Sequence, residues 1–283
     1  MKPVKPSIGG QAVIEGVMMR GPKYTAIAVR KNDEIIIKKE ENRSLSDKYK
    51  FLKLPILRGM LSLVEMLIIG IQALSYSASI VGDEEEKLSS RDVAFALLFA
   101  IGFAVLLFII IPTAAVKIIG GNVESPFWLN MIEGVLRIFI FFAYLFIITS
   151  MKDVRRVFEY HGAEHKAVHC YEHDEKLTCE NAAKYTTLHP RCGTSFLMMV
   201  MIVSILLFSL LGWPSIAVRI ISRIILLPLV AGVSYEFIRL AGKSSSPVVS
   251  IINKPGIWLQ KLTTREPDES QIEVALEALK SVL

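Results

Sequence analysis

The chain has 283 residues, of which 52% are hydrophobic, and its mean hydropathy of +0.47 is too high for an ordinary soluble domain of this length. Its formal net charge is +5, but the lysines and arginines lie beside apolar runs rather than among base-stacking aromatic residues, which argues against nucleic-acid binding. All three cysteines lie in one polar segment, and their odd number argues against a secreted disulfide framework and for reduced thiols in the cytosol.

Residues 1–54 are predicted to form a cytosolic N-terminal region with a small β-meander. Runs rich in Val, Ile and Thr are separated there by Gly-Pro and Asn-Asp pairs, which are typical of turns. The predicted strand runs are 11–20, 24–30 and 34–39.

The first of these runs carries the polar motif GGQAVIEGVMMRGP. The motif lacks the spacing of a phosphate-binding loop and indicates a glycine-punctuated strand and turn. In this interpretation Glu15 and Arg20 are surface or paired charges. The alternative brings Glu15 to a metal as a further ligand or acid.

Residues 55–92 are predicted to form an interfacial or re-entrant helix followed by an acidic linker. The segment 55–80 is apolar but carries several polar and charged side chains, and an acidic run follows at 83–86. Positive loops remain on the cytosolic side of a membrane. Because 1–58 contains 13 lysines and arginines and 151–194 contains seven, a span between them at 55–80 would separate two segments that both belong inside.

The remaining hydrophobic pattern predicts a mainly α, polytopic membrane helix bundle with about four spans. A helix needs about 20 apolar residues to cross the hydrocarbon layer. Two spans fall within 93–150 and two within 195–240. Their predicted bounds are 93–112, 132–150, 196–213 and 216–240.

Several charged residues fall inside these apolar segments, where burial in lipid is costly. Pairing between helices of the bundle is the favoured interpretation. The alternative is a polar cavity for a lipid headgroup or a transported ion. The residues concerned are Glu65, Glu133, Arg137, Arg223, Glu236 and Arg239.

Residues 241–283 are predicted to form a cytosolic tail with amphipathic helices. Asp268 and Gln271 have the spacing of a capping box. Apolar residues then recur at helical spacing, at Ile272, Ala275, Leu276 and Leu279. Four spans place both termini in the cytosol, so the predicted location is the inner (plasma) membrane, as a multi-pass protein.

The polar segment 151–194 is a predicted cytosolic loop that contains all five histidines and all three cysteines. In the sequence H-G-A-E-H, His161 and His165 are four residues apart, so a helix places both imidazoles on one face. The order H-x-x-E-H is an inverted zincin pattern, in which two histidines bind zinc and the glutamate acts as a general base. Glu164 is therefore the predicted catalytic residue.

A second donor pair, His189 and Cys192, directly precedes the third predicted span. If the second and third spans are neighbours, this pair and the pair His161 and His165 meet at the membrane surface and complete a tetrahedral zinc site. Four protein ligands make such a site structural, whereas three ligands and a water make it catalytic. A solvated histidine-rich loop without metal is the alternative.

The other donors of this loop exceed the needs of a four-ligand site. His169 and His173 continue the i+4 series, and we expect them to be solvated. A reactive thiol needs an electropositive surrounding, which spacing does not indicate for Cys170 and Cys179, so we expect both to be inert.

Four motifs resemble the YqhQ family of uncharacterised bacterial membrane proteins, which are commonly labelled predicted metal-dependent enzymes. They are GGQAVIEGVMMRGP, YHGAEHK, HPRCGTSF and PGIWLQKLTTREPDESQIEVA. Most of the chain is tied to the family by these motifs. The resemblance implies that His161, Glu164, His165, His189 and Cys192 belong to family motifs, whereas His169, Cys170, His173 and Cys179 lie in a more permissive stretch.

The leading hypothesis is a membrane-embedded, cytosol-facing zinc protein that acts as a metal-dependent hydrolase on a membrane-proximal substrate. The alternative is a non-enzymatic membrane scaffold or assembly factor with a structural metal site. A transporter ranks third because four spans without repeats fall short of the inverted-repeat plan. The expected partners are the lipid bilayer and either other membrane proteins or further copies of the chain, but no nucleic acid. Whether the chain is an enzyme stays open.

Overall fold

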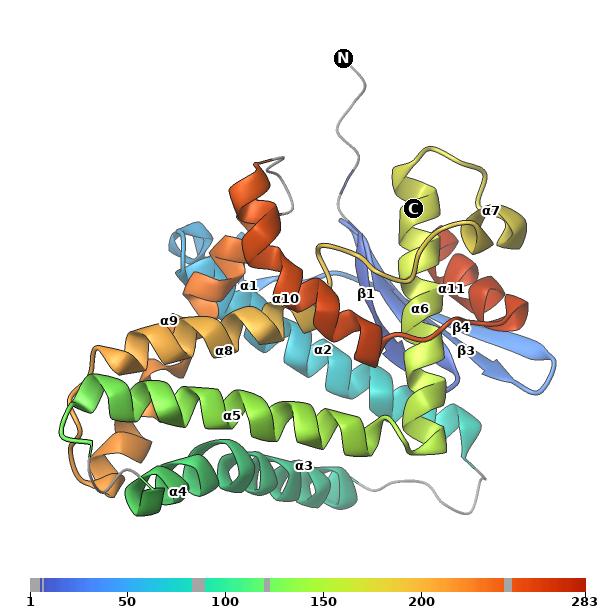
Figure 1. The fold of residues 1–283 in the computed structure, drawn as a ribbon. Coiled ribbons are helices and arrows are strands. Elements are labelled where there is room, and N and C mark those ends of the chain that lie inside the picture. The colour runs from blue at the N-terminus through green and yellow to red at the C-terminus, as the bar shows by residue number, and fades with distance from the viewer. Residues whose placement is uncertain (1–5, 7, 83–89, 120–122, 242–245) are drawn as a thin grey trace.

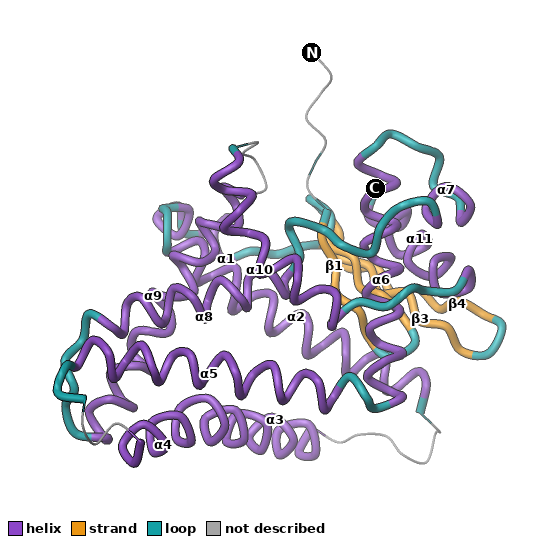
Figure 2. Tube along the Cα trace, viewed as in Figure 1, coloured by secondary structure: helices purple, strands orange, loops and turns teal. Residues whose placement is uncertain are grey.

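The computed structural model describes residues 6, 8–82, 90–119, 123–241 and 246–283 (Figures 1 and 2). Most of this part of the chain is helical, and its strands form one antiparallel sheet near the N-terminus. The mainly α class with a small sheet is therefore confirmed. The predicted acidic run at 83–86 lies outside the described residues.

The sheet has four strands in the order β1-β2-β3-β4, one more than predicted. Its strands are β1 (Gly9–Val13), β2 (Gly16–Arg20), β3 (Tyr24–Lys31) and β4 (Glu34–Glu41). The predicted run 11–20 is divided because the chain turns at Ile14 and Glu15, where Glu15 adopts a φ of 50°. A positive φ in a two-residue turn is normally marked by Asn, Asp or Gly, and Ile-Glu gives no such signal.

Helices cover both faces of the sheet. On one face lie α6 (Lys152–Glu172) and α11 (Glu269–Val282), and on the other lies α2 (Leu57–Val81). The capping box that starts α11 is confirmed, and the four apolar residues predicted for its buried face are all buried. The hydrophobic core between the sheet and the helices α6 and α11 includes Val17, Ala28, Tyr160, Leu276 and Leu279.

The remaining helices are short connecting segments and long apolar helices. The short ones are α1 (Leu45–Lys48), a 3-10 turn (Lys50–Lys53) and α7 (Cys179–Ala183). The apolar part comprises α3 (Ser90–Val105), a π-helical turn (Leu106–Ile110), α4 (Ile111–Ile119), α5 (Pro126–Ile148), α8 (Gly193–Ser209), α9 (Ile216–Ala241) and α10 (Pro247–Thr263).

Four helices of the described chain are long and apolar enough to cross a membrane, as many as predicted, but they are not the same four. They are Leu57–Val81, Arg91–Ile118, Pro126–Ile148 and Ile216–Leu240. The predicted span 196–213 forms α8, whose 17 residues reach only about 25 Å, because the chain leaves the helix ahead of Gly212 and Pro214. The predicted interfacial segment 55–80 forms α2, which has the length of a span while one face packs on the sheet.

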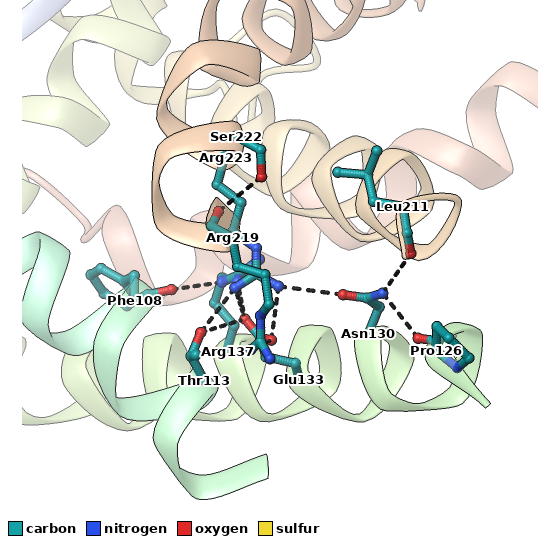
Figure 3. Close-up of polar contacts among 10 residues, drawn as sticks. All are labelled: Phe108, Thr113, Pro126, Asn130, Glu133, Arg137, Leu211, Arg219, Ser222 and Arg223. Carbon is teal, nitrogen blue, oxygen red and sulfur yellow. Dashed lines mark hydrogen bonds and ion pairs between the residues drawn. The ribbon is translucent and has the colours of Figure 1, made fainter. Parts of the chain in front are cut away.

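Four of the six charged residues predicted to pair inside the bundle do so: Glu133, Arg137, Arg223 and Glu236. Arg58 of α2 binds Glu236 of α9 through two contacts. Glu133 of α5 forms ion pairs with three arginines, one from its own helix and two from α9 (Figure 3). Glu65 of α2 pairs instead with the sheet, where Arg20 of β2 lies 3.3 Å away, and Arg239 is exposed near the end of α9.

Candidate metal centre

Helix α6 carries His161 and His165 one turn apart on one face. Their ring centroids are 4.5 Å apart, as the i, i+4 spacing predicts. The end of α10 leads into a segment that runs directly against this helix, where the Arg265 N–H donates to the Phe158 carbonyl over 2.9 Å. Gly162 makes this approach possible, because any Cβ there would overlap the Arg265 carbonyl oxygen.

Both imidazoles are held through Nδ1 by backbone carbonyl groups. His161 Nδ1 lies 2.7 Å from the carbonyl oxygen of Thr263, and His165 Nδ1 lies 2.5 Å from that of Thr187. A carbonyl oxygen only accepts, so each Nδ1 carries the proton and each Nε2 keeps its lone pair. Metal-binding histidines are commonly oriented by such outer contacts.

The two Nε2 atoms converge on the sulfur of Cys192. His161 Nε2 lies 3.1 Å from Cys192 Sγ, and the ligand atoms of His161, His165 and Cys192 all lie within 4.8 Å of one another. Cys192 is buried and caps the N-terminus of α8, where Sγ accepts a hydrogen bond from the Thr194 N–H. A helix N-terminus favours negative charge, and cysteine ligates metals as the thiolate. We call these three residues the His-His-Cys group.

Burial disfavours the protonated form of three histidine rings of this region. It lowers the pKa of His165, although the hydrogen bond with Cys192 opposes this effect. It also lowers the pKa of His169 and of His189. The neutral imidazole is the form that binds metal ions.

Glu164 is buried beside the His-His-Cys group, where α6 packs on β1. Burial raises the pKa of its carboxyl, while His161, His189 and the backbone N–H of Gly10 lower it. Gly10 permits the contact, since a Cβ there would come within 3.1 Å of the Glu164 carboxyl carbon. A buried carboxyl with a raised pKa in such a place is suited to take up a proton near neutral pH.

His189 is the one predicted ligand that lies outside the His-His-Cys group. It forms a second possible ligand set with His169 and Glu172. Its Nδ1 accepts from the Arg191 N–H over 3.3 Å, and its Nε2 lies 3.4 Å from Glu172 Oε2. Its ring centroid is nevertheless only 5.6 Å from that of His165. The four predicted ligands are therefore neighbours, but only three of them converge.

The remaining donors of the loop occupy different surroundings. His169, which was expected to be solvated, is half-buried and donates through Nε2 to the Leu188 carbonyl over 2.9 Å. His173 is exposed, as predicted. Cys170 is buried in the core beneath the sheet and Cys179 is half-buried, and neither joins a ligand set among the described residues.

Two other glutamates, Glu15 and Glu172, lie outside the His-His-Cys group. Glu15 does not approach the His-His-Cys group; it binds Arg156 and accepts a hydrogen bond from Tyr160 Oη over 3.3 Å. Glu172 was missed, although its spacing of three residues from His169 on one helix was a usable signal.

Comparison with known proteins places similarity along almost the whole chain. A family model described as "Protein of unknown function (DUF1385)" matches residues 54–283. The chain is 34% identical over 296 positions to the "Uncharacterized protein YqhQ" of Bacillus subtilis (strain 168), with 99% of this chain and 93% of that protein covered. No solved structure matches the chain. The resemblance seen in the sequence motifs is confirmed, and the family match contains the whole His-His-Cys group.

Proposed function

We propose that the chain, which belongs to the DUF1385 family, binds one zinc ion through His161, His165 and Cys192 and is a metal-dependent hydrolase of the membrane surface. Two imidazole nitrogens and one thiolate sulfur form a donor set that suits zinc. Three protein ligands leave one position of a tetrahedral site for water or substrate, which is the pattern of catalytic zinc. Zinc in such a position supplies a Lewis acid and acidifies water.

Glu164 is proposed as the general base. Its carboxyl is buried, interacts with His161 and accepts the Gly10 N–H, so both the helix and the sheet fix its place. In this role Glu164 takes the proton from the attacking water and returns it to the leaving group. A substrate at the membrane surface is proposed because the His-His-Cys group lies at the start of α8, which is an apolar helix.

The observation that carries the proposal is the pair of Nδ1 contacts to backbone carbonyls. These contacts direct both Nε2 lone pairs toward the same sulfur. A histidine cluster without ligand function has no need for two Nε2 lone pairs that face one sulfur. Solvated loop histidines would instead make water contacts on both nitrogens.

Metal content of the purified full chain tests this assignment. We expect about one zinc per chain, lost when His161→Ala is combined with His165→Ala and also in Cys192→Ala. The matched controls are His173→Ala and Cys179→Ala, which remove the same donor types outside the group and are expected to keep the metal. Equal zinc in all variants, or no zinc in the parent chain, would refute the assignment of the His-His-Cys group as a zinc site.

A structural zinc site is the second candidate, because His189 is close enough to supply a fourth ligand. Its ring centroid lies 5.6 Å from that of His165. Rotation of the His189 ring would complete a four-ligand site. Such a site would fix the loop between α6 and α8, as a scaffold or assembly factor requires. The two candidates differ in whether Glu164 is needed once zinc is bound.

The membrane placement is part of the proposal. Large apolar side chains such as Phe95, Leu98 and Phe99 are more than two-thirds exposed on α3, a surface that lipid would cover. The excess of lysine and arginine in 1–58 and 151–194 favours a cytosolic sheet and metal site. This placement requires α3–α4, α5, α8 and α9 to cross the plasma membrane, with the 17 residues of α8 at the lower limit of a span and α2 held against the sheet. Both termini then lie in the cytosol of a bacterial cell.

A further inference from the structure

A buried arginine cluster lies at the end of the helical bundle away from the sheet. It joins Glu133 and Arg137 of α5 to Arg219 and Arg223 of α9, with Thr113 of α4 beside them (Figure 3). In Figure 1, α4, the start of α5 and α9 meet at the left, whereas the sheet and α6 lie at the right. None of the four charged side chains is more than 10% exposed.

The cluster carries more positive than negative charge. Three guanidinium groups share the single carboxylate of Glu133, and among the described residues they form no ion pair with any other acidic side chain. Two positive charges are therefore uncompensated inside the bundle. Removing an unpaired charge from water is costly, and charged residues inside apolar spans usually mark a functional site.

Arg137 and Arg223 are braced by groups around the cluster. Arg137 Nε donates to the carbonyl of Phe108 over 2.7 Å, within the π-helical turn between α3 and α4. Arg223 donates to Thr113 Oγ1 over 2.9 Å and to Asn130 Oδ1 over 3.3 Å. The acceptors in these contacts are neutral, so they hold both guanidinium groups in place without compensating their positive charge.

Arg219 differs from Arg137 and Arg223 because one of its N–H groups is still able to donate a hydrogen bond. Its terminal nitrogen donates to Glu133 over 2.9 Å, but its buried Nε has no hydrogen-bond partner in the described part of the chain. The ring of Trp213 covers the guanidinium at 3.5 Å. Trp213 belongs to an exposed segment between α8 and α9, so a small movement of this ring opens Arg219 to the surroundings.

We infer that the cluster is a binding site for a dianionic phosphate group, either the phosphomonoester of a lipid headgroup or free phosphate. A phosphomonoester carries about two negative charges at neutral pH, which matches the two uncompensated positive charges. Guanidinium groups bind phosphate oxygens in a fork, and the free Nε–H of Arg219 is the donor that begins such a contact. The site is independent of the metal centre, which lies at the other end of the bundle.

Trp213 provides the reporter for a test with the full chain in detergent micelles. Replacing the exposed Trp128 and Trp258 with Phe leaves Trp213 as the sole tryptophan. Its quenching is measured with brominated phosphatidic acid, phosphatidylglycerol and phosphatidylcholine, and its emission is measured with inorganic phosphate. Arg219→Gln is the test variant. Arg239→Gln, an exposed arginine at the other end of α9, is the matched control.

The expected result is quenching by phosphatidic acid at about tenfold lower lipid fraction than by phosphatidylcholine, with phosphatidylglycerol between them. Arg219→Gln should abolish this preference and Arg239→Gln should keep it. A lipid preference identifies a headgroup, and a saturable response to inorganic phosphate alone identifies the free anion. Equal quenching by all three lipids without a phosphate response, or a preference that survives Arg219→Gln, overturns the proposal.

Glu133→Gln gives a second route if Arg219→Gln does not fold. Removing the competing carboxylate should strengthen the preference for phosphatidic acid, because three arginines then face the anion alone. A folded Glu133→Gln chain with an unchanged or weaker preference overturns the proposal.

Discussion

Replacing Gly162 with alanine tests how the candidate metal centre is held together. The new Cβ would lie about 1 Å closer to the Arg265 carbonyl oxygen than the 3.0 Å that real Cβ contacts keep. It would also come within 3.1 Å of Thr187 Cγ2. The obstructing atom is backbone, so the segment after α10 has to move away from α6. That segment carries the Thr263 carbonyl that orients His161.

The cost can be worked out from these contacts. Overpacking costs about 1–3 kcal/mol, and loss of the Arg265 to Phe158 hydrogen bond adds about 1 kcal/mol. The total of about 2–4 kcal/mol should lower the melting temperature by about 5–10 °C. Loss of the contact that fixes the His161 tautomer should weaken zinc binding by about 10- to 100-fold.

Thermal unfolding and zinc titration of the purified chain measure both effects. Gly102→Ala is the matched control, because Gly102 is also helical and its Cβ would meet no atom within 4 Å. We expect the control to melt no lower than the parent chain, since alanine has the higher helix propensity. A Gly162→Ala chain that melts like the parent and binds zinc with the same affinity would refute this account of the site.

Three other predictions concern the general base, the topology and the core. Glu164→Gln should abolish function in a complementation assay while zinc content and folded yield stay unchanged, since a general base is not a ligand; full complementation with zinc bound would favour the scaffold. A reporter fused after Glu124 should register outside and one after Glu175 inside, and an external signal at Glu175 would reject the cytosolic metal site. Leu279→Ala should cost about 2–5 kcal/mol in thermal or denaturant unfolding, because this side chain is fully buried against the sheet; Leu283→Ala, at an exposed position, should cost almost nothing.

Local features of the fold could be predicted from the sequence. The capping box of Asp268 and Gln271 and the helical spacing of His161 and His165 depend only on neighbouring residues, and both are present. The extra strand was missed because the turn at Glu15 lacks the residues that normally mark a positive φ. The end of α8 was predicted four residues too late, at Trp213 instead of Ser209, because hydropathy continues after the helix has ended.

The arrangement of the site depends on contacts between distant segments, which spacing does not encode. His189 was assigned to the same ligand set as His161 because the two donor pairs flank the second and third predicted spans, but the backbone around His189 is fixed by Gln260 of α10. The surroundings of Glu164 also depend on a distant segment, because its carboxyl accepts a hydrogen bond from the Gly10 N–H of β1. Each of these contacts joins residues more than 70 positions apart, so only the folded chain reveals them.

The coordination of the metal is the most direct test of the central claim. X-ray absorption at the zinc edge of the purified full chain should show two nitrogen donors at about 2.0 Å, one sulfur at about 2.3 Å and one oxygen from water. The sulfur should disappear from the spectrum of any zinc that remains in Cys192→Ala. Outer-shell scattering from three imidazole rings instead of two would mean that His189 closes the site and that its role is structural, and a chain without bound zinc would contradict the account altogether.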